Sequence, residues 1–177
     1  MFNHLLQISS FKSGPQHFNT PVWALVVFIL LFTGVQGFSL SLSPGNEMIR
    51  MFVASFLKMV VLGAVLLGWM RSVKISEHFM STFMMIVFIA LLVEIIKLPL
   101  TTMIRDAKLT SDVTTAAFLS IPLIGVAIWQ YLVWFYGLKQ VGERTKGEIL
   151  AVMISLVLVS EVVGFVLSKI GSPVEGF

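Results

Sequence analysis

The residues best placed to do chemistry are four charged side chains inside long apolar runs: Lys58, Glu161, Glu94 and Arg50. Lys58 stands in the middle of IRMFVASFLKMVVLGAVLLGWM, residues 49–70. An ionisable group inside a membrane-spanning helix costs about 2.5 to 3.5 kcal/mol on insertion scales, so it needs a counter-charge, water or a route to the surface. We therefore expect these four residues to form an intramembrane polar site.

Lys58 and Glu161 lie at matching depths in their apolar runs. Each lies about ten residues, or about 15 Å, from the same end of the bundle that the runs would form. Glu94 lies closer to that end and nearer to Arg50. We predict that Lys58 pairs with Glu161 in preference to Glu94, and that Lys97 is close enough to a helix end to extend its ammonium group to the membrane surface.

The second apolar run carries a narrow polar stripe. At about 100° per residue, Glu47, Arg50, Ala54 and Lys58 fall within an arc of about 80°. Three interpretations stay open. The buried charges could form a static ion pair that fixes helix packing, or a polar cavity, open to the outer side, that binds an ion or small polar solute. Alternatively, Lys58 could reach toward a lipid headgroup or into the interface with a partner protein.

Other kinds of chemistry find no support in the sequence. The chain has no cysteine, which excludes disulfides, thiolate metal sites and thiol nucleophiles. Its three histidines lie outside the apolar runs and form no ligand cluster. There is no glycine-rich phosphate loop, no zinc-type His/Glu motif and no serine nucleophile elbow. We expect a protein that is not an enzyme and that uses no metal, cofactor or nucleic acid.

The composition points to the bilayer as the solvent for this chain. Hydrophobic residues make up 57% and charged residues only 12%, against about 25% charged in typical soluble domains. The mean hydropathy is +0.96. A soluble protein of 177 residues could not hide so much apolar surface in one core. We therefore predict an all-α, polytopic membrane protein.

Spanning helices need about 20 mostly apolar residues, and five segments qualify. The predicted transmembrane domain covers residues 21–177, with helices at about 21–40, 48–70, 79–99, 114–138 and 147–170. The preceding residues 1–20 are predicted to be an interfacial segment, with a frayed tail as the alternative. A cleaved signal peptide is a rival interpretation of the first apolar run, but a secretory leader usually begins with a short basic region.

Two patterns bear on orientation. The side that holds the N-terminus carries six Lys and Arg residues against five on the other side, which weakly favours a cytoplasmic N-terminus. Aromatic residues also gather on the six-charge side. Because Trp and Tyr favour the headgroup layer, we predict four interfacial anchors there: Trp23, Trp69, Trp134 and Tyr136.

The stretch IWQYLVWFYGLKQVGERTKGEILAVMISLVLV, residues 128–159, resembles the last two helices of the Yip-domain family of Ypt/Rab-interacting membrane proteins. The shared features are an aromatic-rich helix, a GLK exit at residues 137–139, a short basic loop and small residues at the start of the next helix. The resemblance implies a five-helix bundle with a cytosolic N-terminus. Eukaryotic members carry a longer cytosolic region and an acidic Tyr-Gly-Pro-type signature, so this chain looks more like the bacterial branch, which is largely uncharacterised.

Two functions follow as hypotheses. The first is a non-enzymatic scaffold or accessory subunit of the bacterial inner membrane, which would act through helix–helix association as a homo-oligomer or with a membrane protein partner. The second is a small transporter or channel component that uses Lys58, Glu161 and Glu94. In both cases the lipid bilayer is the main partner of the chain.

Overall fold

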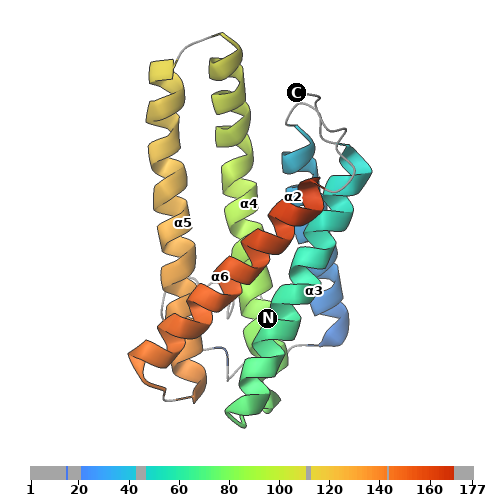
Figure 1. Ribbon diagram of the computed structural model, residues 1–177, viewed down its shortest axis with the longest axis vertical. Coiled ribbons are helices and arrows are strands. Elements are labelled where there is room, and N and C mark those ends of the chain that lie inside the picture. The colour runs from blue at the N-terminus through green and yellow to red at the C-terminus, as the bar shows by residue number, and fades with distance from the viewer. Residues whose placement is uncertain (1–14, 16–20, 43–46, 111–112, 143, 170–177) are drawn as a thin grey trace.

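The protein is all-α in the computed structural model, which describes residues 15, 21–42, 47–110, 113–142 and 144–169 (Figure 1). The predicted interfacial segment at 1–20 lies, apart from Pro15, outside these described residues. The helices are α2 (Val22–Ser41), α3 (Met48–Ser72), the short 3₁₀ helix η2 (Ser76–His78), α4 (Phe79–Leu109), α5 (Val113–Gly142) and α6 (Lys146–Lys169).

The five long helices run up and down between two ends of a bundle (Figure 1). We call the end where α2 finishes the Ser41 end, and the end where α3 finishes the Ser72 end. Helix α4 packs against both α2 and α5, while α3 packs against α2 and α6. Helix α6 starts beside α5 at the Ser72 end and crosses the bundle obliquely to reach α3.

Helix α4 is the core of the bundle. Every residue from 81 to 91 is buried, which means that α4 is enclosed on all sides over three turns. A helix that is apolar all round is expected to occupy such a position. The outer faces of the other helices carry the exposed apolar residues instead, for example Leu30 on α2, Phe118 on α5 and Leu158 on α6.

Within the described residues, four helical stretches are long and apolar enough to cross a membrane: Val22–Ser41, Met48–Ser72, Ser76–Leu109 and Thr114–Val141. These correspond to α2, α3, α4 with η2, and α5. Helix α6 has 24 residues and carries Glu161 in its interior, and it is not one of the four. A fifth crossing therefore stays a prediction, although a fifth long helix is present where the sequence predicted it.

The main difference from the predicted boundaries is at Pro99. We expected the third helix to end there, but α4 continues to Leu109. Proline removes one backbone hydrogen bond without obliging the helix to stop, and membrane helices tolerate it. The next turn is reinforced by two threonine hydroxyls, since Thr101 Oγ1 donates to the Leu98 carbonyl at 2.9 Å and Thr102 Oγ1 to the Pro99 carbonyl at 2.7 Å.

The Ser72 end is held by specific polar contacts. Lys74 adopts a left-handed conformation after α3, and the Ile75 N–H donates to the Met70 carbonyl at 2.9 Å, as in a Schellman cap. A guanidinium nitrogen of Arg144 donates to the Val73 carbonyl at 3.0 Å, which ties the segment before α6 to the end of α3. These contacts fix the end from which α6 departs.

Helix α6 itself begins with a capping box. The Glu148 N–H donates to Thr145 Oγ1 at 3.4 Å, and the Thr145 N–H donates to Glu148 Oε2 at 3.2 Å. The two residues therefore satisfy each other's unpaired backbone donors, which defines where the helix starts.

Helices α2 and α3 approach closely because of a glycine. A Cβ atom at Gly37 would lie 3.0 Å from the Cα of Phe52 and 2.9 Å from its ring. One of these neighbours is backbone, so a larger residue would push the two helices apart. Gly34, one turn earlier on α2, has nothing within 4 Å of the same position.

We predict opposite effects for alanine at these two glycines. Both substitutions gain the same intrinsic helix propensity, so Gly34→Ala is expected to preserve or raise thermal stability in detergent. Gly37→Ala is expected to lower it relative to Gly34→Ala, by about 1 to 3 kcal/mol, which is the usual cost of overpacking. The measurement is thermal unfolding of the two purified variants, and equal melting temperatures would contradict the close approach of α2 and α3.

Candidate functional site

Two adjoining hollows between the helices form one polar cavity. They share five residues, Gln36, Lys58, Glu94, Lys97 and Glu161, which come from α2, α3, α4 and α6. The wider part has a volume of about 420 Å³ and extends toward the Ser41 end, where Ser39, Ser55 and Thr101 also line it. The narrow part, about 60 Å³, lies deeper and adds Gln130, Tyr131 and Trp134 of α5 to its lining. The cavity therefore brings together polar groups from all five helices.

The ion pair between Lys58 and Glu161 joins two helices across this cavity. Lys58 Nζ lies 2.8 Å from Glu161 Oε1, and Lys58 is the partner on α3 while Glu161 is on α6. The side chain of Lys58 is 15% exposed and that of Glu161 is 64% exposed. The pairing predicted from their matching depth is thus present, with the ammonium group as its more deeply buried member.

Glu94 forms an ion pair that was not predicted from the sequence. Its Oε1 lies 3.4 Å from Lys97 Nζ, one turn along α4. The expectation that Lys97 sits near a helix end was wrong, because α4 continues for three turns beyond it. Lys97 consequently lines the cavity with the other three charges.

Arg50 stands apart from the cavity. It belongs to the first turn of α3 and is half-buried, but it is not among the described residues that line either part. Its place in the predicted polar site is taken by Lys97. The polar stripe of α3 therefore contributes Ala54 and Lys58 to the wall, while its beginning lies outside.

Two buried polar atoms have no hydrogen-bond partner in the described part of the chain and belong to cavity-lining residues. They are Oε1 of Gln36 and Nε1 of Trp134, in residues that are only 7% and 4% exposed. Buried polar atoms in proteins almost always have a partner, protein or water. One is an acceptor and the other a donor, and both belong to side chains that border the narrow part of the cavity.

The aromatic anchors divide into two kinds. Trp23 is 66% exposed near the start of α2, as an interfacial anchor should be, and Trp69 and Tyr136 are half-buried. The prediction for Trp134 was wrong, because its ring is buried in the core and packs edge-on against Tyr131, with centroids 5.9 Å apart. Position near a helix end suggested an interface, but the rotation of α5 turns this ring inward.

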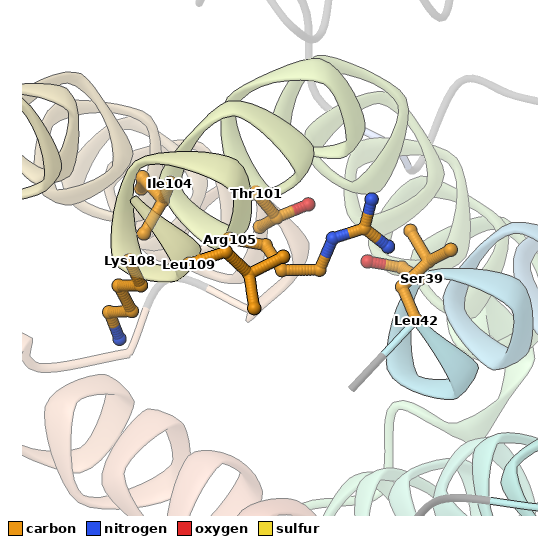
Figure 2. A pocket seen from close by; sticks show the side chains of 7 residues that line it. All are labelled: Ser39, Leu42, Thr101, Ile104, Arg105, Lys108 and Leu109. Atoms are coloured by element: carbon orange, nitrogen blue, oxygen red, sulfur yellow. The ribbon is translucent and has the colours of Figure 1, made fainter. Parts of the chain in front are cut away.

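A second groove leads from the cavity to the Ser41 end. It has a volume of about 350 Å³, lies between α2 and α4, and shares Ser39 and Thr101 with the cavity (Figure 2). Figure 2 shows Arg105 extending from α4 toward Ser39 on α2. The Arg105 guanidinium also contacts Asp106 Oδ1 at 3.1 Å. The polar cavity is thus continuous with a groove whose outermost charged residues are basic.

The opposite direction is closed by packed apolar side chains. Leu62 of α3 lines the narrow part of the cavity and is 1% exposed. Beyond it toward the Ser72 end lie the fully buried Leu66 and Met70 of α3 and Leu138 of α5. The cavity therefore has access from one end of the bundle and an apolar floor toward the other.

The lining also indicates what the cavity can hold. Among the described residues no group of three or more His, Cys, Asp or Glu side chains could hold a metal ion. The available groups are instead two ammonium groups, two carboxylates, amides, hydroxyls and an indole N–H. Such a set can bind a small polar molecule through charge and hydrogen bonds.

Six polar cavity residues were not predicted from the sequence: Gln36, Gln130 and Tyr131 in the narrow part, and Ser39, Ser55 and Thr101 in the wider part. A detectable signal existed for the two glutamines, since each is an uncharged polar residue inside an otherwise apolar run. Side chains of this type within membrane helices usually face other helices and not lipid. Both glutamines are uncharged, so a pattern of charged residues does not include them.

Comparison with known proteins adds no further constraint. No family model, no curated protein and no solved structure matches the chain. The resemblance to the Yip-domain family stays a hypothesis based on residues 128–159.

We predict unequal effects for the two halves of the Lys58–Glu161 pair. Glu161→Gln leaves a mostly buried ammonium group without its counter-charge, so it is expected to lower the stability by about 2 kcal/mol, allowing for partial screening. Lys58→Met leaves an exposed carboxylate and is expected to cost less. The double variant is expected to be more stable than Glu161→Gln alone, because no lone charge remains.

The measurement is thermal unfolding of the four proteins in the same detergent. Lys139→Met, which removes an exposed charge near the end of α5, serves as the control and is expected to melt like the wild type. Strictly additive losses in the double variant would contradict a direct interaction between Lys58 and Glu161.

Proposed function

We propose that this protein crosses the membrane with all five long helices and binds a small polar solute in the polar cavity, as a small transporter or a component of one. The membrane is proposed to be a bacterial inner membrane, with the N-terminus in the cytoplasm and the Ser41 end facing outward. The observation that carries the proposal is that two ion pairs and two unpartnered buried polar atoms line one cavity within an apolar bundle.

Helix length and surface support the fifth crossing. Helix α6 has 24 residues, about 36 Å at 1.5 Å per residue, which exceeds the hydrocarbon thickness of about 30 Å even with some tilt. Its exposed face carries Leu158, Val162 and Val166. Glu161, the charged residue in its interior, has Lys58 as a counter-charge.

A purely structural ion pair would need no cavity. Buried pairs are best satisfied when packing and further hydrogen bonds enclose them, because desolvation can exceed the attraction between the charges. Here Glu161 is 64% exposed, and the pair borders a volume of about 420 Å³. Intramembrane charges that face a water-filled space are characteristic of solute and ion pathways.

A cavity that opens at only one end of the bundle is what a transporter needs in the state that binds solute from one side of the membrane. A solute could reach the charges from the Ser41 end, while the apolar floor around Leu62 and Leu66 blocks the way to the Ser72 end. Release on the other side would require α6 to move relative to α3. The Lys58–Glu161 contact is then the bond between these helices that a solute could compete for.

The scaffold function expected first from the sequence is the alternative. It would use outward apolar faces, such as that of Phe118, Ile121 and Ile128 on α5. It would have no need of the cavity, so variants that fold normally but change the cavity distinguish the two functions.

Cysteine labelling tests the access and orientation of the cavity, and the natural chain contributes no background thiol. We expect Thr101→Cys, in the wider part, to react with a charged, membrane-impermeant methanethiosulfonate added outside intact cells. Thr82→Cys, on the same helix and 0% exposed, is the matched control and should stay unlabelled. Labelling of Thr101→Cys only in inside-out vesicles would reverse the orientation, and no labelling from either side would contradict an open cavity.

Binding can be followed through Trp134, whose ring lies at the cavity. A variant with Trp23, Trp69 and Trp129 changed to Phe leaves it as the only tryptophan. We expect its emission to shift saturably with at least one of four solute classes: amino acids, polyamines, carboxylates and sugars. Adding Lys58→Met and Glu161→Gln should abolish that shift in folded protein. No shift with any class, together with retained folding, would favour the scaffold function.

A further inference from the structure

We infer that the ligand of the polar cavity is a small zwitterion that carries an ammonium group and a carboxylate, as free amino acids do. The inference rests on the proposed function, because it names the chemistry of the solute that the same cavity would bind. It is carried by the charge balance of the lining and by the two unpartnered polar atoms.

The charged groups that line the cavity sum to zero. Lys58 and Lys97 supply two positive charges, and Glu94 and Glu161 supply two negative ones. In a space surrounded by apolar helices, a ligand with net charge would leave that charge uncompensated, and such charges are costly where the dielectric constant is low. A ligand with no net charge avoids this cost.

The same four groups argue against a solute without charges. Keeping four ionised side chains inside a bundle is unfavourable, and an uncharged polyol could be bound by amides and hydroxyls alone. A zwitterion makes use of both signs. Its carboxylate can accept from an ammonium group of the protein, while its own ammonium group donates to Glu94 or Glu161.

The two lysines of these ion pairs can still donate further hydrogen bonds to a ligand. An ammonium group has three donor hydrogens, and Lys58 and Lys97 each donate one hydrogen bond within the described residues. The Lys97–Glu94 contact is the longer of the two, at 3.4 Å against 2.8 Å. The charged groups of the cavity therefore compensate one another, and a ligand can add contacts without first separating both pairs.

The unpartnered atoms have the same dual character. Oε1 of Gln36 is an acceptor and Nε1 of Trp134 is a donor; both atoms are covered by protein, so a rotation of each side chain would bring them to a ligand ammonium group and a ligand carboxylate. Both residues are more than nine-tenths buried and line the narrow part of the cavity. This observation is independent of the charges and again calls for one donor and one acceptor on the ligand.

The narrow part limits the size of any substituent. Its volume is only about 60 Å³, and its wall combines the apolar side chains of Phe32, Leu62 and Val157 with a larger polar surface. A short side chain fits this volume better than a long one. We therefore expect alanine and similarly small amino acids to bind more tightly than lysine or glutamate.

The test uses three-carbon probes that differ in charge. Alanine carries both charges, propionate only the negative one, propylamine only the positive one, and glycerol neither. With the single-tryptophan protein described above, we expect alanine to shift the Trp134 emission at a concentration at least tenfold below that needed for the other three. If that variant fails to fold, the thermal shift of the wild-type protein with the same probes gives the same comparison.

Substitutions of charged residues in the cavity wall provide a second test. Lys97→Met and Glu94→Gln are each expected to weaken alanine binding at least tenfold in folded protein, whereas Lys139→Met leaves it unchanged. Equal or tighter binding of propionate, propylamine or glycerol would overturn the zwitterion while the proposed function stands. Absence of binding by every probe and by the four wider solute classes would overturn both.

Discussion

An ammonium group in the middle of an apolar helix must find a counter-charge, and in this protein the counter-charge for Lys58 comes from a helix about a hundred residues further along the chain. The 2.8 Å contact with Glu161 therefore links α3 to α6, the helix that crosses the bundle obliquely. The position of α6 and the cavity that it borders both follow from this link. Because α6 must bring its carboxylate to α3, it leaves the neighbourhood of α5 and encloses one side of the space in which Glu94 and Lys97 also lie.

The packing around this link explains why a cavity exists at one end only. Between residues 81 and 91, α4 is enclosed by its neighbours, and large apolar side chains fill the Ser72 end of the bundle. Toward the Ser41 end the small polar residues Ser39, Ser55 and Thr101 join the lining, beside the apolar Leu40 and Phe165. Small side chains leave volume between helices, and polar ones make that volume suitable for water or a solute. A closed apolar half and an open polar half are the arrangement on which the proposed binding function depends.

Sequence reasoning succeeded where one rare feature had one physical explanation. Long apolar runs predicted five helices, and the matching depths of Lys58 and Glu161 predicted their pairing. It failed where several explanations were equally compatible with the residues. Pro99 could end a helix or be accommodated within one, and this choice also decided whether Lys97 lay at a helix end or in the wall of the cavity.

By itself, then, the sequence determined that the chain forms apolar helices of membrane-spanning length and that its few interior charges need partners, because the length of an apolar run and the cost of an unpaired charge are local properties. Only the tertiary structure decided how each helix is rotated. Most of these helices are apolar all round, so their periodicity marks no inward face, and contacts such as that of Gly37 with Phe52 set the rotation instead. That rotation turned Trp134 from an expected lipid anchor into part of the cavity and brought Gln36 and Gln130 beside the charges.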